Sequence, residues 1–158
     1  MDSAEAVLIA GAARSVKNNE SAAIWQLRVM LACGDLQGLI GCKPVRRHAF
    51  EFHLGVGRAD LVLFHRDCGI TIIEAKADLG MGMICAGIGQ LFLYESEARQ
   101  RFVGAHAPKY VNKVLCAPVD PADSVSVWRA CELAGVKFVH LARFAALRGM
   151  IDRLNGTH

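Results

Sequence analysis

The sequence predicts an α/β protein in which helices flank a mixed central sheet. Two apolar runs, 61–64 and 70–73, enclose a short segment with turn-forming residues, which predicts an antiparallel hairpin. Amphipathic patterns over residues 20–33 and from about 83 to 101 predict helices before and after that hairpin. Further on, two apolar strands separated by a helix predict a parallel crossover. Antiparallel and parallel pairs together make the predicted sheet mixed.

Length and composition are those of one compact domain. The chain has 158 residues, of which 53% are hydrophobic and 21% are charged, and this length supports a sizeable core. We therefore predict a single domain over residues 1–158, with its core at about 20–141 and residues 1–19 forming a short helix or an arm. The net charge of +3 permits a nucleic-acid partner without requiring one, because the placement of charge matters more than its total.

The cysteines and the start of the chain predict a cytoplasmic protein. Six cysteines are scattered without any CxxC pair, a pattern typical of reduced and mostly buried thiols. They are Cys33, Cys42, Cys68, Cys85, Cys116 and Cys131. The apolar run 6–13 has no basic segment before it and is too short to span a bilayer. Neither a signal peptide nor a membrane helix is therefore expected.

The elements before the hairpin are a helix, a connection and a strand. Gly34 ends the helix over residues 20–33, and Glu20 continues the stripe of this helix that faces the core. The stripe consists of Glu20, Ile24, Leu27 and Leu31. Residues 35–43 are a Gly-rich connection, and residues 44–54 alternate enough between apolar and polar side chains to predict a strand.

Three charged residues lie at the end of the hairpin away from its turn. Asp60 opens the first strand, whereas Glu74 and Lys76 close the second and share one face. A turn centred near residues 67–68 makes paired residue numbers sum to about 135, which sets Asp60 opposite Ala75. A bulge near Asp60 would turn its carboxylate to the face of Glu74. A lone Glu-x-Lys is usually a surface ion pair, but burying charge is costly unless it is paired or binds metal, so the cluster indicates a site.

The elements after the hairpin begin with a loop over residues 77–82 and the helix that follows it. Gln90 and Tyr94 lie one turn apart on this helix and can project together. Gly87 precedes them and lets the helix approach the hairpin closely. The last third is predicted as strand 110–117, helix 121–134, strand 136–141 and a closing helix 142–154.

The order of three short motifs, Gly57-Arg58-Ala59-Asp60, Glu74-Ala75-Lys76 and Gln90-Leu91-Phe92-Leu93-Tyr94, resembles that of the PD-(D/E)xK nuclease superfamily. The Gln-x-x-x-Tyr element is most similar to the RecB-like branch, and the hairpin is similar to that of archaeal Holliday-junction resolvases. The resemblance covers about residues 20–100 and implies a restriction-endonuclease-like αβββαβ core. Ala59 stands where the family name has Pro, and the clustered cysteines of some RecB-like members are missing from the sequence.

The resemblance implies a metal-dependent DNA nuclease that leaves 5′-phosphate and 3′-hydroxyl ends. Its catalytic residues would be Asp60, Glu74, Lys76, Gln90 and Tyr94. Asp60, Glu74 and the carbonyl of Ala75 would hold one or two Mg²⁺ or Mn²⁺ ions, since hard oxygen ligands suit these cations. A glutamate of the first helix often completes the metal site in this family, and Glu20 matches that role. A glutamate in the first turn of a helix is equally explained by the helix dipole.

Basic residues beside these motifs predict contacts with DNA. Arg46 and Arg47, followed by His48, form a basic cluster in the predicted strand 44–54. Guanidinium groups there would match phosphate oxygens near the active site. The other interpretation is a solvated edge strand whose charges discourage pairing with another chain. Arg58 stands in the turn before Asp60 and must therefore lie close to the carboxylates.

The sequence is also compatible with other functions. The chain could be a non-catalytic nucleic-acid or protein-binding module that has kept the nuclease fold, or a nuclease that acts on RNA. Small nucleases often pair, which by analogy predicts a possible homodimer. No histidine pair stands at metal-ligand spacing and no Gly-x-Ser-x-Gly motif occurs, so zinc and serine-nucleophile chemistry are unsupported.

Overall fold

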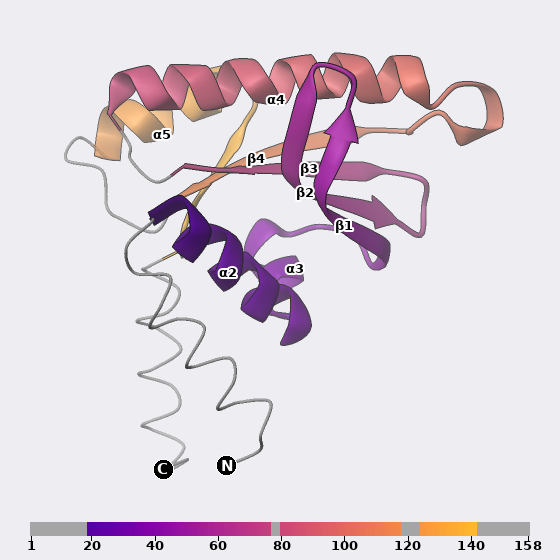
Figure 1. Ribbon diagram of the computed structural model, residues 1–158, viewed down its shortest axis with the longest axis horizontal. Coiled ribbons are helices and arrows are strands. Elements are labelled where there is room, and N and C mark those ends of the chain that lie inside the picture. The colour runs from indigo at the N-terminus through magenta and orange to yellow at the C-terminus, as the bar shows by residue number, and fades with distance from the viewer. Residues whose placement is uncertain (1–18, 77–79, 118–123, 142–158) are drawn as a thin grey trace, which may run out of the picture.

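A five-stranded sheet is the centre of the molecule (Figure 1). The computed structural model describes residues 19–76, 80–117 and 124–141, without the side chains of residues 19–22 and 124. The strands, in their order across the sheet, are β1 (Val45–Leu54), β2 (Gly57–His65), β3 (Ile70–Ala75), β4 (Val111–Ala117) and β5 (Lys137–His140). β1, β2 and β3 pair antiparallel, whereas β3, β4 and β5 pair parallel. The predicted α/β class and mixed sheet are confirmed.

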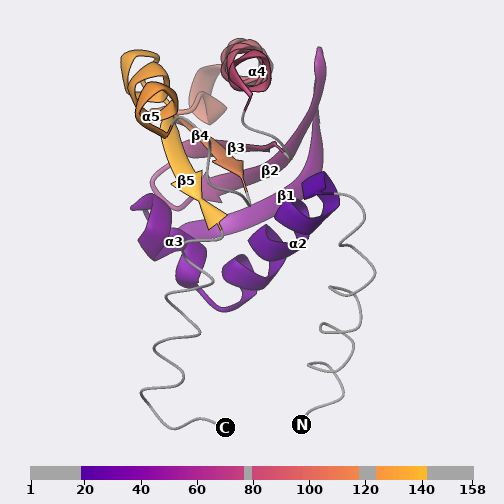
Figure 2. The ribbon, with the colours of Figure 1, turned by 90° about the vertical axis from the view of Figure 1, so that its left-hand side faces the viewer.

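Helices cover both faces of this sheet (Figure 2). The helices α4 (Met81–Arg101) and α5 (Ser124–Leu133) lie on one face, and α2 (Asn19–Ala32) and α3 (Asp35–Ile40) lie on the other. A short 3₁₀ helix, η1 (Gly104–His106), follows α4. The predicted αβββαβ order is present from α2 to β4, and α5 makes the predicted parallel crossover to β5. The predicted N-terminal arm, apart from residue 19, and the closing helix 142–154 lie outside the described residues.

The predicted connection over residues 35–43 is wrong in one respect, because it contains α3. Leu36 and Ile40 stand four residues apart on this helix, and both are buried. Gly34 and Gly41 flank the helix with φ angles of 78° and 63°. Glycine adopts this left-handed conformation without steric cost. The glycines that suggested an open connection are therefore the boundaries of a helix.

The register of the β2–β3 hairpin differs by one residue from the predicted register. Paired residue numbers sum to 134, rather than to about 135. The amide of His65 donates to the carbonyl of Gly69 across a three-residue turn, in which Cys68 has a φ of 68°. A left-handed third residue is common in such turns. Continued along the strands, this register sets Asp60 opposite Glu74 and not opposite Ala75.

Two hydrophobic layers hold the helices against the sheet. Ile72 packs in the layer under α4 with Leu91, whereas the adjacent Ile73 packs in the layer under α2 with Leu27. Neighbouring residues of β3 thus face opposite layers, as strand alternation requires. All six residues of β3 are buried, which places its carboxyl end in the interior of the sheet.

The long helix α4 spans the face that carries the predicted site. It begins at Met81, two residues before the predicted start. Its buried residues recur every three or four positions, as one face of a helix requires, and they are Ile84, Gly87, Leu91, Tyr94 and Ala98. Among the described residues, no helix is both long and apolar enough to cross a membrane.

Candidate active site

The site lies where β2 separates from β3. Leu61 and Ile73 form the last β2–β3 pair of the ladder toward this end, although β2 continues back to Gly57 beside β1. The next residue of β2 is Asp60, and its Oδ2 accepts a hydrogen bond of 2.6 Å from the backbone amide of Ala75. A side-chain carboxylate therefore takes the place of the backbone acceptor that the departing strand no longer supplies.

A kink in the β1–β2 hairpin accompanies this separation. In β2, Leu61 packs under α2 whereas Ala59 packs under α4, although two residues of one parity should share a face. Phe50 and Phe52 of β1 change faces in the same way, and Glu51 between them has a φ of 50°. The β1–β2 register does not shift at this point. The irregularity that the sequence suggested near Asp60 is thus a shared kink and not a one-residue bulge.

Beyond the kink, the end of the β1–β2 hairpin rises beside α4 (Figure 1). The hydroxyl of Tyr94 donates a 2.8 Å hydrogen bond to the carbonyl of Arg58. Near the end of α4, Nη1 of Arg101 donates a 2.7 Å hydrogen bond to the carbonyl of His53. These two side chains tie both strands of the curved part of the hairpin to the helix, on the turn side of the kink.

Glu74 and Lys76 lie at the carboxyl end of β3, on the face covered by α4. Both are buried, with 3% and 7% of their surface exposed. The ammonium of Lys76 donates to Oε1 of Glu74 and to Oε1 of Gln90, each at 2.6 Å. An ammonium has three N–H donors, so two of them are engaged by these partners. The arrangement fixes the ammonium between the strand and α4 with one N–H left to direct at a ligand.

The pKa of Tyr94 depends on the negative charge of the site. Burial and the negative charges of Glu74 and Asp60 together raise the pKa of its phenol to about 12, although a hydrogen bond with Gln90 acts to lower it. Both carboxylates therefore act on a single phenol on α4. At neutral pH the hydroxyl of Tyr94 stays protonated and serves as a hydrogen-bond donor.

Cys116 is a neighbour of the site that sequence reasoning did not single out. It pairs with Ala75 in the parallel β3–β4 ladder, and its Sγ lies 3.5 Å from the carbonyl oxygen of Glu74. Burial, together with the charges of Asp60 and Glu74, raises the pKa of this thiol, so it stays a neutral thiol. Only the register between β3 and β4 could have placed it here, because these strands are far apart in the sequence.

The donors at this place fit a hard divalent cation. Within the described parts of the chain, no three His, Cys, Asp or Glu side chains gather as a metal-binding group, and the candidate ligands are the two carboxylates of Asp60 and Glu74. One or two carboxylates, with waters completing the shell, are the usual protein share of a Mg²⁺ site. The two carboxylates raise the pKa of both Tyr94 and Cys116, and this negative potential would be offset by a cation.

The other two predicted metal ligands are the carbonyl of Ala75, whose direction follows from the strand, and the side chain of Glu20. In an extended strand the N–H and C=O of one residue point to the same side, so the carbonyl of Ala75 is directed to the side on which its amide meets Asp60. Glu20 lies in the first turn of α2, but its side chain lies outside the described residues, and its role stays a prediction.

The predicted DNA-binding arginines lie in two separate places. Arg58 is beside the site: its side chain is 59% exposed and lies 3.7 Å from Glu51. Arg47 pairs with Phe64, four residues along β2 from Asp60, which is roughly 13 Å at about 3.3 Å per residue. Arg46 precedes it and lies farther still along β1. The structure therefore does not bring Arg46 and Arg47 to the carboxylates, and a role in binding DNA stays a prediction for all three arginines.

Gly87 lets α4 lie directly on the site. A Cβ at this position would come within 2.7 Å of Cδ1 of Leu115 and 3.2 Å of Cε of Lys76. We expect Gly87→Ala to destabilise the fold by about 1–3 kcal/mol, the usual cost of overpacking a core, as measured by urea denaturation. Gly89→Ala is the matched control, because a Cβ there meets nothing within 4 Å. A helical Gly→Ala change at an open position stabilises by about 0.5–1 kcal/mol. Equal effects of the two substitutions would contradict the close approach.

The chain has two tyrosines, and both are expected to resist ionisation in the folded state. Burial and the hydrogen bond with Asp67 raise the pKa of Tyr110 to about 12 as well. A raised pKa in the folded state stabilises the fold below the unfolded value of 10.0, and this stabilisation is lost as the pH rises through about 12. Tyrosinate absorbance at 295 nm should therefore be weak at pH 10 in the native chain and half-developed in urea. Half-ionised tyrosine in the native chain at that pH would contradict the burial of both phenols.

No protein-family model and no curated protein sequence matches this chain. Among solved structures, it is similar to the crystal structure of a repair endonuclease from Pyrococcus abyssi, with a TM-score of 0.47 and 15% sequence identity. The matched region covers 70% of this chain and 44% of that chain, so this chain spans less than half of that endonuclease.

Proposed function

We propose that this protein is a metal-dependent DNA nuclease that hydrolyses phosphodiester bonds to leave 5′-phosphate and 3′-hydroxyl ends. The observation that carries the proposal is the meeting of Asp60, Glu74 and Lys76 where β2 leaves β3. Two carboxylates next to one buried ammonium have no structural necessity in an apolar sheet, since buried charge costs free energy. The same three groups are suited to hold a cation, a water and a phosphate together.

Asp60 and Glu74 would hold Mg²⁺ or Mn²⁺, with the carbonyl of Ala75. When bound, such a cation polarises a phosphate and lowers the pKa of a coordinated water. The amide of Ala75 keeps the carboxylate of Asp60 in a fixed orientation, so the carboxylate need not reorganise when a ligand arrives. Fixed groups of this kind account for much of the electrostatic stabilisation in enzymes.

Lys76 would act on the substrate through its remaining N–H. Glu74 and Gln90 hold the ammonium at two points, and its third donor can orient the attacking water or neutralise charge on the phosphate. Gln90 is a positioning residue, because it acts through Lys76. Tyr94 is another, since its hydroxyl holds the backbone at Arg58 next to Asp60. The exposed guanidinium of Arg58 would contact the phosphate backbone beside the scissile bond.

The test is an activity screen on supercoiled plasmid, single-stranded DNA, branched DNA and RNA. Each substrate is incubated with Mg²⁺, Mn²⁺ or EDTA, and the product ends are identified by phosphatase-dependent kinase labelling. We expect DNA cleavage with either metal, none in EDTA, and 5′ ends that accept label only after phosphatase treatment. Titration calorimetry with Mn²⁺ is the accompanying measurement. The absence of both cleavage and Mn²⁺ binding would instead favour a non-catalytic binding module. Cleavage of RNA and not of DNA would make RNA the substrate.

Two further expectations stay predictions. The homodimer inferred by analogy is tested by the mass in solution from size-exclusion chromatography with light scattering. The cytoplasmic location is tested by fractionation of cells that express the full chain.

A further inference from the structure

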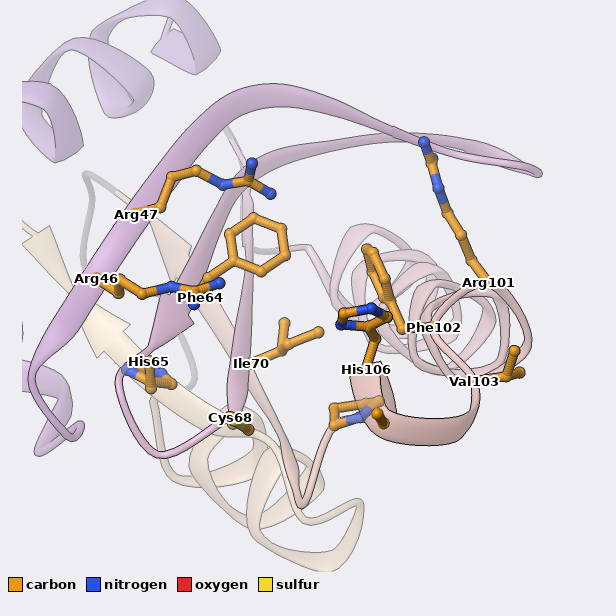
Figure 3. Close-up of a pocket in the computed structure, with 13 residues that line it drawn as sticks. Arg46, Arg47, Phe64, His65, Cys68, Ile70, Arg101, Phe102, Val103 and His106 are labelled. Carbon is orange, nitrogen blue, oxygen red and sulfur yellow. The ribbon is translucent and has the colours of Figure 1, made fainter.

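A hollow of about 470 Å³ lies at the end of the sheet opposite to the Asp60–Glu74 site. Its walls come from three parts of the chain that meet around the turn end of the β2–β3 hairpin (Figure 3). The start of β1 supplies Arg46 and Arg47, and the last residue of α4 supplies Arg101. Phe102 and the 3₁₀ helix η1, with His106, close the far side. This volume is within the range of about 300–1,000 Å³ that is usual for small-ligand sites.

The lining is cationic and contains no acidic residue. In the part of the chain that the structure describes, none of Arg46, Arg47 and Arg101 forms an ion pair. The guanidinium of Arg47 lies 4.5 Å from the centre of the Phe64 ring, and Arg101 is held by the carbonyl of His53. The guanidinium of Arg101 is directed to the end of the β1–β2 hairpin, so the cations of the hollow itself are Arg46 and Arg47. Two guanidinium groups without carboxylate partners point to an anion as the ligand, because planar guanidinium forks match phosphate oxygens.

The inner wall of the hollow is apolar and partly aromatic. Phe64 and Ile70 form its buried side, and Phe102 stands half-buried with its ring at 87° and 6.0 Å from that of Phe64. Figure 3 shows Phe102 and His106 facing this wall across the hollow from the side of α4. A small inorganic anion would use the arginines and leave the wall uncovered. A ligand that carries both a phosphate and a flat apolar ring would use both.

We propose that this hollow binds a nucleotide unit, with its phosphate at Arg46 and Arg47 and its base against Phe102. The inference rests on the proposed function and deepens it, since a substrate strand would supply such a unit. Arg47 lies roughly 13 Å from Asp60 along the strand direction at about 3.3 Å per residue. That separation is about four steps of a nucleic-acid strand at 3.4 Å each. A strand cut at the carboxylates therefore reaches the hollow with a nucleotide a few positions away.

The test measures the binding of a 3′-fluorescein-labelled dT15 oligonucleotide by fluorescence anisotropy, in EDTA and between 50 and 200 mM salt. The double variant Arg46→Gln/Arg47→Gln is expected to bind at least ~10-fold more weakly. Its slope of log affinity against log salt should be smaller by about 1.4, which is two phosphate contacts at ~0.7 each on a single strand. The matched control is Arg99→Gln/Arg129→Gln, which removes the same charge; Arg99 pairs with Glu95 on α4, and Arg129 is exposed on α5.

The aromatic part of the site has its own variant. Phe102→Leu keeps an apolar side chain but removes the ring, and should weaken dT15 binding at least ~5-fold. The slope of log affinity against log salt should stay unchanged, because that slope counts phosphate contacts and the substitution removes none. An unchanged affinity of Phe102→Leu would overturn the assignment of the base to this wall. Arg47 also packs on the ring of Phe64. If its replacement unfolds the chain, Arg46→Gln alone is expected to weaken binding at least ~3-fold and to lower the slope by about 0.7.

Competition with free dTMP identifies the source of the nucleotide. Displacement of dT15 by millimolar dTMP assigns the hollow to a free nucleotide. If dTMP does not displace dT15 and the double variant binds dT15 more weakly, the hollow is assigned to a nucleotide within a strand. Binding by the double variant that equals the binding by its control overturns the proposal. Because these measurements are made in EDTA, they do not depend on metal or cleavage. Failure of the hollow is thus distinguishable from failure of the proposed nuclease, which is judged by metal-dependent cleavage alone.

Discussion

Asp60→Asn is expected to lower metal-dependent cleavage by at least ~10²-fold, since one electrostatic group can contribute that much to catalysis, while the fold keeps its stability. The reason is that an asparagine Oδ1 can still accept the hydrogen bond that the amide of Ala75 donates to Asp60. The substitution removes one negative charge from the cation site and little else. Single-turnover cleavage, Mn²⁺ calorimetry and urea denaturation measure the three quantities separately.

Asp67→Asn is the matched control for this variant. Asp67 lies in the same hairpin but at its turn, where it accepts hydrogen bonds from Tyr110 and from the amide of Gly69. The same side-chain change there should leave cleavage and Mn²⁺ binding as they are. Cleavage by Asp60→Asn at a rate similar to that of the control would remove Asp60 from the mechanism. A loss of stability that matched the loss of cleavage would make Asp60 a structural residue.

Lys76→Met is expected to lower cleavage by a factor similar to that of Asp60→Asn and also to destabilise the fold. Glu74 is 3% exposed and would lose the ammonium that lies 2.6 Å from its Oε1. Removing one partner of a buried ion pair costs about 3–5 kcal/mol, because the other charge is left uncompensated.

A double variant separates the structural role of this pair from its catalytic role. Glu74→Gln/Lys76→Met replaces the ion pair by neutral groups of similar size, which often restores stability. We expect urea denaturation to show that most of the loss is recovered, while cleavage stays at the level of Lys76→Met. Lys113→Met is the control, because Lys113 pairs with Glu95 on the same face of the sheet and away from the carboxylates. Cleavage recovered together with stability would show that the pair serves only the fold.

The core of the site could be predicted from the sequence because its parts are close together in local structure. Glu74 and Lys76 share a face in any strand, Asp60 lies at the same end of the hairpin for any turn near residue 67, and Gln90 and Tyr94 are one helical turn apart. The predicted register was nevertheless off by one, because Cys68 adopts a left-handed conformation that its residue type does not announce.

Local turn geometry in the sequence is enough to place Arg46 and Arg47. Gly55 and Gly57 bracket a tight turn, so β1 must run antiparallel to β2 and return toward the β2–β3 turn. That geometry pairs Arg47 with Phe64 and places both arginines at the end opposite to Asp60. Of the three predicted DNA-binding arginines, Arg58 is the one that lies at the end of the hairpin that carries Asp60.

Local sequence patterns account for the helices and strands, the hairpin with its charges, and the helix face that would meet them, because each depends on residues close together in the chain. The packing of the whole chain sets how the ammonium of Lys76 is shared between strand and helix, and it brings Cys116 beside the carboxylates. It also decided that Arg101, Phe102 and His106 complete a hollow begun by β1. These contacts join segments whose relative placement is set by the packing of α4 on the sheet, and no local pattern encodes that placement.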